Sequence, residues 1–275
     1  MAAHEDFTIV ERGAGPPVVL VPGVQGRWEY SRATVEALAP FHRVITFSLG
    51  DERPRNGSGS TPIDVLAAQV ERAMDRKGLD GAPVIGVSFG ALVALRFAAT
   101  RPGRTPALVM ISAPGPRWQL RPRHDLYARL PWLFGPVFLA ESPFRLRAEV
   151  LAALTDRRAR RAFALRQLRT VLTAPVSLAR MAARARFIAS YDRVADCQHV
   201  TMPTLIVHGE PGLDHVTGDG GTTEYAQLIA GARCVPLERT GHLGSVTRAD
   251  ECASIVRAFL NDANRDRAHR GHSAA

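Results

Sequence analysis

The sequence predicts an α/β protein built on a mostly parallel sheet flanked by helices, with a helical cap inserted into it. Short, continuous apolar runs are typical of strands buried on both faces of a parallel sheet, and they occur at residues 17–21, 83–85, 107–112 and 204–209. Helix-forming segments alternate with these runs, which favours a sheet covered by helices on both faces. A chain of 275 residues is long enough for one such domain with an insertion.

The first third of the chain alternates regularly between strands and helices. Before the second buried run, the expected elements are an edge strand at residues 7–11, the strand at 17–21, a helix at about 29–39, a strand at 42–47 and a helix at about 62–77. Thr61 and Pro62 open that last helix as an N-cap and a first-turn proline, and Gly78 ends it. The polar, Pro- and Gly-rich residues before Thr61 predict a loop.

The alternation stops in the middle of the chain. Between Trp118 and Asp196 no segment predicts a convincing strand, and arginine-rich helical segments are punctuated by Pro131, Pro136, Pro143 and Pro175. Because the strand pattern resumes afterwards, we expect an insertion rather than a second independent domain. The predicted division is a core of residues 1–116 and 197–262 with a helical cap of residues 117–196.

The remaining elements complete the predicted sheet. They are a strand at residues 204–209, a helix near 223–229, a strand at 232–237 and a final helix at about 249–260. Residues 263–275 are charged and lack apolar periodicity, which predicts a disordered tail. His269 and His272 in this tail are therefore expected to be solvated rather than metal ligands.

Residues 86–90, Gly-Val-Ser-Phe-Gly, carry the strongest chemical signal in the chain. An apolar run precedes Ser88 and a helix-forming segment follows it, so the serine stands at a turn between a strand and a helix. Gly86 and Gly90 remove the Cβ atoms that would collide where strand and helix approach each other. The pattern predicts a nucleophile elbow, which requires an acid after a later strand and then a histidine near the C-terminus.

Composition and charge exclude several classes of function. The formal net charge is +9, but Lys77 is the only lysine, so the arginine excess indicates a coding bias rather than nucleic-acid recognition. No helix-turn-helix, zinc-finger or RNA-binding signature accompanies it. No apolar run is long enough to cross a membrane, and the N-terminal residues lack the apolar core of a secretory signal. We therefore expect a cytoplasmic protein that binds no nucleic acid.

The sequence indicates no cofactor and no metal. Cys197, Cys234 and Cys252 are odd in number and widely spaced, which predicts neither a disulfide framework nor a metal-binding cluster. The loop at residues 22–26 does not match the Gly-x-Gly-x-x-Gly pattern of dinucleotide binding, and no phosphate-binding Gly-Lys-Ser/Thr loop occurs. Catalysis is therefore expected to rely on side chains.

With its elbow serine on a parallel sheet, the chain resembles the α/β-hydrolase superfamily, specifically the capped serine hydrolases and esterases, over about residues 7–260. In that family the triad acid follows the strand after the cap, in a segment like His-Gly-x-x-Asp, and residues 208–214 look like this pattern with two extra residues. The resemblance implies Asp214 as the acid, with Glu210 and Asp219 as alternatives.

The family's histidine lies in the loop before the last helix, where Gly241 and His242 look like its Gly-His pair. A serine hydroxyl is a poor nucleophile near neutral pH, so His242 would take the proton of Ser88 as its Oγ attacks a carbonyl, and Asp214 would fix the imidazole tautomer. His208, at a strand end, is expected to be structural.

The family stabilises the oxyanion with two backbone N–H groups, which correspond here to Val24 and Phe89. Where the family usually has His-Gly in the first loop, this chain has Pro22 and Gly23, and Gln25 is therefore an alternative donor. A serine at position 88 makes the chain unlike the related haloalkane dehalogenases and epoxide hydrolases, which use an aspartate there.

The leading functional hypothesis is a serine hydrolase that cleaves a carboxylic ester or thioester through an acyl-enzyme. An acyltransferase, a lyase or a carbon–carbon bond hydrolase could use the same three residues. A receptor-like protein that binds a small molecule with little turnover is the alternative from a different class. Product partitioning between water and an added alcohol would separate hydrolysis from transfer.

The cap suggests two features of the substrate. Arginines at positions 157, 158, 160 and 161 indicate either a solvated helix face or an electropositive rim that attracts an anionic substrate or an acidic acyl carrier. Apolar cap residues either line a pocket for an apolar acyl or alcohol group or hold the cap together, and we expect most to be internal. They are Trp118, Leu130, Trp132, Leu133, Phe134, Val137, Phe138, Phe144, Phe163, Met181 and Phe187.

Overall fold

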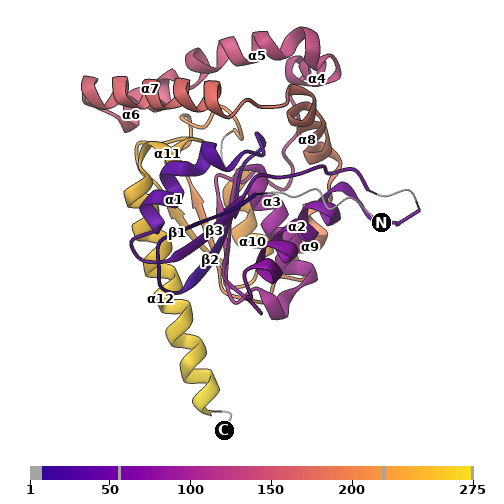
Figure 1. Ribbon diagram of the computed structural model, residues 1–275, viewed down its shortest axis with the longest axis vertical. Helices are drawn as coiled ribbons and strands as arrows, with labels where there is room; N and C mark the ends of the chain where they lie inside the picture. The colour runs from indigo at the N-terminus through magenta and orange to yellow at the C-terminus, as the bar shows by residue number, and fades with distance from the viewer. Residues whose placement is uncertain (1–7, 55–56, 219–220, 274–275) are drawn as a thin grey trace.

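The computed structural model describes residues 8–54, 57–218 and 221–273, and Figure 1 shows a sheet layered between helices beneath a separate group of helices. The sheet has the strand order β1-β3-β2-β4-β5-β6-β7. Strand β1 is antiparallel to β3, whereas each of the other neighbouring pairs is parallel. The strands are β1 (Ile9–Arg12), β2 (Pro17–Val21), β3 (Arg43–Phe47), β4 (Val84–Val87), β5 (Leu108–Ile111), β6 (Thr204–His208) and β7 (Arg233–Pro236). The predicted α/β class is confirmed.

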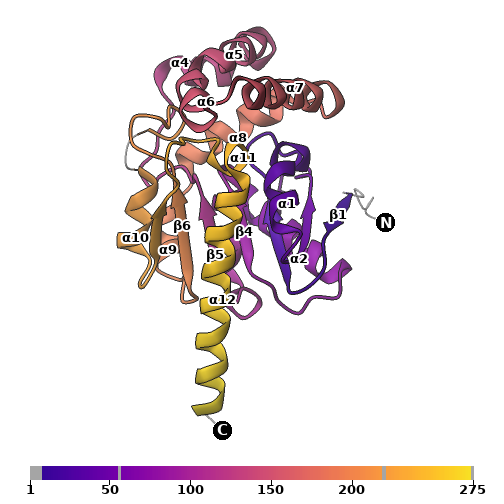
Figure 2. The same ribbon diagram turned by 90° about the vertical axis from the view of Figure 1, so that its left-hand side faces the viewer.

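Helices cover both faces of the sheet, as the alternation predicts. One face packs against α1 (Arg32–Leu38) and α12 (Ala249–Ser273). The other packs against α2 (Pro62–Arg76), α3 (Phe89–Thr100), α9 (Arg193–Cys197) and α10 (Tyr225–Leu228). Short connections form α11 (Gly244–Thr247) and the 3₁₀ turns η1 (Trp28–Ser31), η2 (Pro102–Arg104) and η3 (Gly221–Glu224). Figure 2 shows α1 and α12 on the same side of the strands.

Strand β2 illustrates how the apolar runs build this core. Its side chains alternate between the two faces, so Val18 and Leu20 contact the α1 and α12 layer while Val19 and Val21 contact the α2 and α3 layer. All four are at most 1% exposed. A strand with helices on both sides needs an apolar residue at every position, which is why these strands appear as unbroken apolar runs.

The start of α2 confirms the capping signal in the sequence. The Asp64 carboxylate accepts hydrogen bonds from the Thr61 N–H at 2.8 Å and from the Thr61 hydroxyl at 2.7 Å. Pro62 occupies the first helical position, where a missing N–H costs nothing. The same Asp64 also pairs with Arg96 on α3, at 2.8 Å, so the cap joins two helices of one layer.

The predicted insertion forms the group of helices above the sheet. It consists of α4 (Pro122–Arg129), α5 (Pro131–Arg145), α6 (Arg147–Ala153), α7 (Arg157–Thr173) and α8 (Leu178–Ser190). Both views place these helices over the end of the sheet where the strands finish, opposite the free end of α12 (Figures 1 and 2). The helix α9 differs from the expectation because it packs on α3 within the core, although residues 193–196 fall in the predicted cap.

Two details of the sequence-based prediction need correction. Pro136 and Pro143 lie inside α5 rather than between helices, because a proline can sit inside a helix at the cost of one hydrogen bond and a local bend. The final helix does not end near Leu260 but continues to Ser273, so residues 263–273 are helical rather than disordered. No glycine or proline interrupts residues 249–270, and exposed charged residues sustain a helix without apolar periodicity.

Across the described ranges, none of the helices combines the length and apolar character needed to span a bilayer.

Candidate active site

Ser88 stands at a sharp turn between β4 and α3, as the elbow pattern predicts. Its φ of 55° and ψ of −120° are sterically unfavourable for a residue with a side chain. A Cβ on Gly86 would lie 2.3 Å from the Gly90 carbonyl oxygen, and one on Gly90 would lie 2.3 Å from the Val21 carbonyl oxygen. The two glycines therefore let strand, turn and helix approach closely enough to hold Ser88 in this conformation.

His242 and Asp214 meet Ser88 above the ends of the strands. The Ser88 Oγ lies 2.9 Å from His242 Nε2, and His242 Nδ1 lies 3.3 Å from Asp214 Oδ2. A carboxylate only accepts hydrogen bonds, so Nδ1 carries the proton and Nε2 is left to accept from the serine hydroxyl. The structure thus brings the three predicted residues into one chain of hydrogen bonds.

The loops that carry the acid and the histidine approach each other through glycines. A Cβ on Gly241 would lie 2.3 Å from the Leu213 carbonyl oxygen, and one on Gly209 would lie 2.5 Å from the Gly241 carbonyl oxygen. These two positions place Asp214, which follows β6, against His242, which follows β7. A larger residue at either position would separate the two loops.

Asp214 is held as a carboxylate. Its Oδ1 accepts from the Val216 and Thr217 N–H groups at 2.9 and 2.8 Å, and its Oδ2 accepts from the Thr217 hydroxyl. Burial alone would raise the pKa of Asp214, but the charge and hydrogen bond of His242 and the hydrogen bonds from Thr217 outweigh it, so this pKa lies well below its usual range. Asp214 is therefore ionised at neutral pH.

The pKa of His242 is shifted upwards, in the opposite direction to that of Asp214. Burial lowers the pKa of its imidazole, but the charge of Asp214, the hydrogen bond to Asp214 and the charge of Glu149 together raise that pKa above its usual value. The site therefore favours the imidazolium that forms when His242 accepts a proton.

The alternative acid Glu210 has a different hydrogen-bond partner. The Glu210 carboxylate accepts a hydrogen bond from the Arg239 N–H at 2.7 Å, and Asp219 lies outside the described residues. His208 Nδ1 contacts the Gly209 carbonyl oxygen at 2.7 Å, a local backbone contact that fits the structural role expected for it.

The two expected oxyanion donors lie close to Ser88. Phe89 is the first residue of α3, where a backbone N–H has no partner within the helix. Val24 lines the same cavity as Ser88, and the preceding Gly23 lies so close that its Cβ would be 3.6 Å from the Ser88 Cβ. Their donor role remains a prediction.

A family model described as the alpha/beta hydrolase fold matches residues 16–249. The chain belongs to the α/β-hydrolase fold family. The match spans the elbow, the cap and the loops that carry Asp214 and His242, which confirms the resemblance inferred from the sequence.

Individual relatives of this α/β-hydrolase fold protein are distant. The chain is 28% identical over 259 residues to the polyketide synthase ThaQ of Burkholderia thailandensis, covering 92% of this chain but only 12% of that protein. It is 24% identical over 262 residues to RutD of Azorhizobium caulinodans, named as a carbamate hydrolase, covering 91% of this chain and 93% of that one.

Similar solved structures include an esterase from Exiguobacterium antarcticum, with a TM-score of 0.74, 18% identity and coverage of 93% of this chain and 95% of that one. An enol-lactonase from Burkholderia xenovorans has a TM-score of 0.73, 21% identity and coverage of 93% and 96%. At these identities the likeness establishes the fold.

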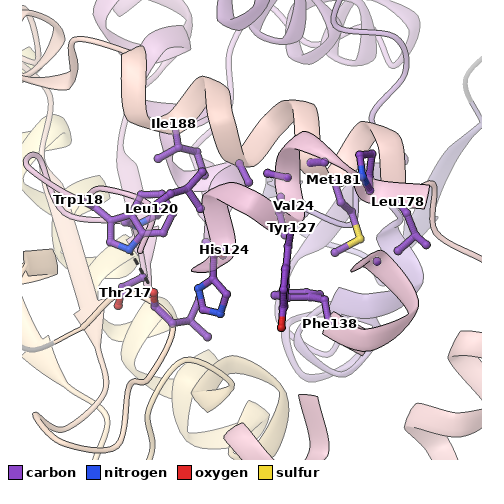
Figure 3. A pocket seen from close by; sticks show the side chains of 18 of the residues that line it. Val24, Trp118, Leu120, His124, Tyr127, Phe138, Leu178, Met181, Ile188 and Thr217 are labelled. Carbon is purple, nitrogen blue, oxygen red and sulfur yellow. Dashed lines mark hydrogen bonds between the residues drawn. The ribbon is translucent and has the colours of Figure 1, made fainter. Parts of the chain in front are cut away.

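A cavity of about 170 Å³ lies between the core of this α/β-hydrolase fold and the cap, and Ser88 is part of its lining. Figure 3 shows Trp118, Leu120, Tyr127 and Phe138 around it, with Met181 and Ile188 contributed by α8. The Trp118 indole donates a hydrogen bond to the Val216 carbonyl oxygen at 3.1 Å, which joins the start of the cap to the Asp214 loop. Most of the lining is apolar.

Three basic residues, His124, Arg145 and His215, interrupt the apolar lining. Arg145 lies 3.2 Å from His124 Nε2 and donates hydrogen bonds to the Phe138 carbonyl oxygen and the Ser142 hydroxyl at 3.0 and 2.9 Å. Burial and the neighbouring Arg145 lower the pKa of His124, so this imidazole is neutral at neutral pH. Arg145 and His124 therefore add a fixed positive charge and a neutral imidazole to the cavity wall.

Two buried residues that sequence reasoning missed hold the surroundings of Ser88. Arg184, on α8, is 2% exposed and donates hydrogen bonds to the Val24 carbonyl oxygen at 3.1 Å and to Glu52 at 3.2 Å. Glu149, on α6, is fully buried and accepts a hydrogen bond from the Leu243 N–H, next to His242, at 2.5 Å. A buried charge in the cap has no signature in local sequence periodicity.

The outer surface of the cap differs from the expectation that its large apolar residues are internal. Trp118, Phe138 and Met181 line the cavity and Phe163 is buried, but Trp132 and Phe144 on α5 are 75% and 80% exposed. The cap helices form one layer over the core, so their outward side chains have nothing above them. On α7 the arginines at positions 157, 158, 161, 166 and 169 are also exposed.

Within the ranges that the structure describes, no group of three or more His, Cys, Asp or Glu side chains is arranged to hold a metal ion. Cys197, Cys234 and Cys252 are free thiols.

Proposed function

We propose that the chain is a serine hydrolase that cleaves a carboxylic ester or thioester. One observation carries this proposal, namely the continuous hydrogen-bonded path from Ser88 Oγ through His242 to the ionised Asp214. The path supplies a nucleophile, a base within reach of its proton and a carboxylate that holds the base in the required tautomer. The raised pKa of His242 supports the same assignment, because it indicates a stabilised imidazolium.

The reaction proceeds in two halves. Ser88 Oγ attacks the carbonyl carbon while His242 Nε2 accepts its proton, and the tetrahedral intermediate collapses as His242 protonates the departing alcohol or thiol. The acyl group is then bound to Ser88. A water molecule, deprotonated by His242, attacks this acyl-enzyme and releases the carboxylic acid, which restores the serine hydroxyl.

The oxyanion would be stabilised by the Phe89 and Val24 N–H groups. Loss of one such donor typically costs about 2.7–4 kcal/mol of transition-state stabilisation, so the position of the Val24 loop matters. The Arg184 hydrogen bond to the Val24 carbonyl oxygen supports this assignment because it holds the loop from the cap side.

The cavity favours a small-molecule ester with an apolar portion. Its apolar walls would bury an acyl or alcohol group, while Arg145 offers a positive charge to an anionic group within the same space.

A thioester carried by an acidic acyl carrier is a second candidate substrate. The exposed arginines of α7, a helix without an acidic residue, favour an acidic partner, and the similarity to a segment of a polyketide synthase supports it. An increase in ionic strength should then slow turnover of the carrier-bound thioester while leaving a small-molecule thioester unaffected, because only the first depends on the surface charge.

The test of the proposed reaction is turnover of p-nitrophenyl esters of increasing acyl length by the parent chain and by Ser88→Ala and His242→Ala. Each substitution should remove nearly all turnover because it removes the nucleophile or its base. Ser254→Ala, on the exposed side of α12, is the matched control and should retain parental activity. Parental turnover in Ser88→Ala would refute the proposal.

Absence of turnover in every variant would instead favour the receptor-like alternative or a lyase or carbon–carbon hydrolase on the same residues. Product partitioning with added alcohol distinguishes an acyltransferase, because a transferase gives the new ester in preference to the acid.

A further inference from the structure

The cap helix α6 carries Glu149, whose carboxylate contacts the loop that contains His242. Glu149 Oε1 accepts a hydrogen bond from the Leu243 N–H at 2.5 Å. Leu243 directly follows His242 in the sequence. Glu149 therefore binds the backbone next to the imidazole that contacts Ser88.

The surroundings of Glu149 are unusual for a carboxylate whose function is only to hold a loop. The residue is fully buried, and its Oε2 has no hydrogen-bond partner among the described residues. Burial without full pairing is unfavourable, and an uncharged residue would avoid this cost. A retained buried charge at this point suggests that the charge itself matters to the neighbouring histidine.

The charged groups that act on Glu149 come from the site itself. His242 favours its ionised form and Asp214 opposes it, while Arg147 on the same helix is exposed. Burial is the largest influence and raises the pKa of Glu149 to about 7 despite the backbone hydrogen bond from Leu243. In return, the charge of Glu149 contributes to the raised pKa of His242.

We propose that Glu149 is a positioning residue. Through it, the cap packed over the core orients His242 and stabilises its charged form. Its hydrogen bond fixes the backbone directly after the imidazole, and its negative charge stabilises the imidazolium formed when Ser88 loses its proton. The catalytic strength of the site therefore depends on α6 being in place over the His242 loop. This inference rests on the proposed function, because it assigns a role in the same reaction.

The test compares Glu149→Gln with the parent in the rate at which a fluorophosphonate labels Ser88 as a function of pH. Gln keeps an acceptor for the Leu243 N–H but removes the charge. Glu149 is ionised above its pKa of about 7, and there the loss of its charge lowers the pKa of His242. The acid limb should therefore move to lower pH, with a plateau rate roughly tenfold lower. Glu149→Ala, which also loses the acceptor, should be slower still.

Glu238→Gln is the matched control. Glu238 is exposed and lies four residues before His242 on the same loop, so the same charge change occurs near the histidine but in solvent, where it is screened. Its pH profile should coincide with that of the parent. A Glu149→Gln profile that also coincides with the parent would overturn the proposal and leave Glu149 with a structural role.

Thermal unfolding shows whether the variant is folded. The pKa of Glu149 is raised on folding, so its contribution to stability is present below the unfolded-state value near 4.5 and is lost as pH rises through about 7. Glu149→Gln lacks this loss, and we expect its melting temperature at pH 8 to equal or exceed that of the parent. A rate defect in a variant of undiminished stability separates positioning from folding.

Titration of the His242 imidazole by NMR separates this inference from the proposed function. If the fluorophosphonate fails to label the parent, Ser88 is not an activated nucleophile and the proposed function fails. The NMR titration then still tests the contact, because a His242 pKa that falls in Glu149→Gln supports the coupling and an unchanged pKa refutes it.

Discussion

The ionisation of His242 determines the predicted pH dependence. Its neutral form accepts the proton of Ser88, and its pKa is raised above the usual 6.5 by Asp214 and Glu149 against the effect of burial. The rate should therefore fall as pH drops through a value above 6.5. Asp214→Ala removes the main cause of the shift, so its acid limb should move to lower pH.

The same variant tests the assignment of the acid. Asp214→Ala should reduce turnover strongly but leave more than Ser88→Ala or His242→Ala, because the nucleophile and base remain. The measurement is kcat/KM for a p-nitrophenyl ester between pH 5 and pH 9. Parental turnover and an unshifted limb in Asp214→Ala would show that the acid lies elsewhere.

Among the catalytic candidates, the sequence predicted the local structure best where a short motif determines the backbone conformation. Gly86 and Gly90 predicted the elbow around Ser88, since only glycine fits the backbone contacts seen there. The choice of Asp214 over Glu210 depended on the resemblance, because both follow the same strand. In the observed loop, the Glu210 carboxylate accepts a hydrogen bond from the Arg239 N–H, whereas the Asp214 carboxylate contacts His242.

Arg184 on helix α8 holds the loop that contains Val24 in place by hydrogen bonds. Arg184 donates hydrogen bonds to the Val24, Leu49 and Gly50 carbonyl oxygens and pairs with the largely buried Glu52. Arg184→Met keeps much of the side-chain volume but releases the loop, so we expect kcat for ester hydrolysis to fall by about tenfold or more, in keeping with a displaced oxyanion donor. It also leaves the Glu52 charge unpaired, and stability should drop by about 3–5 kcal/mol.

The double variant Arg184→Met with Glu52→Gln separates these two effects. Removing the unpaired charge should restore much of the thermal stability, whereas kcat should remain low because the Val24 loop stays free. If the double variant regains parental kcat, Arg184 acts through stability alone.

The helices and strands were predictable to the extent that their signals are local. The N-cap at Thr61 and the apolar run of β2 appear in the structure as expected. The single helix α5 was less predictable, because prolines at positions 136 and 143 usually mark helix ends. Helix α5 packs against α4 and α8 in the cap, and these tertiary contacts override the local preference.

The molecule extends beyond its core along α12. Ala263 is the last residue of this helix that packs in the core, and residues 264–269 are exposed. The end of the helix therefore projects away from the sheet on the side opposite the cap (Figure 1). Deletion of residues 265–275 should change the free energy of unfolding by about 0.5 kcal/mol or less, as for surface changes that remove no core contact.

Chemical denaturation of the two chains measures this difference. Deletion from residue 258 onward is the contrasting variant, because it removes Phe259 and Leu260 from the core and should be strongly destabilising. A large loss of stability from the shorter deletion would mean that the projecting part of α12 contacts the body of the protein.

The family resemblance pointed to His242, whereas the sequence by itself determined the α/β class, the order of the strands along the chain and the elbow at Ser88. Each depends on residues close together in the chain, where periodicity, glycines and capping residues act over a few positions. Only the tertiary structure decided which cap residues line the cavity, that Arg184 holds the Val24 loop and that Glu149 reaches the amide next to His242. These contacts join residues 160 and 94 positions apart, and local patterns do not specify which distant side chains will meet once the cap is seated on the sheet.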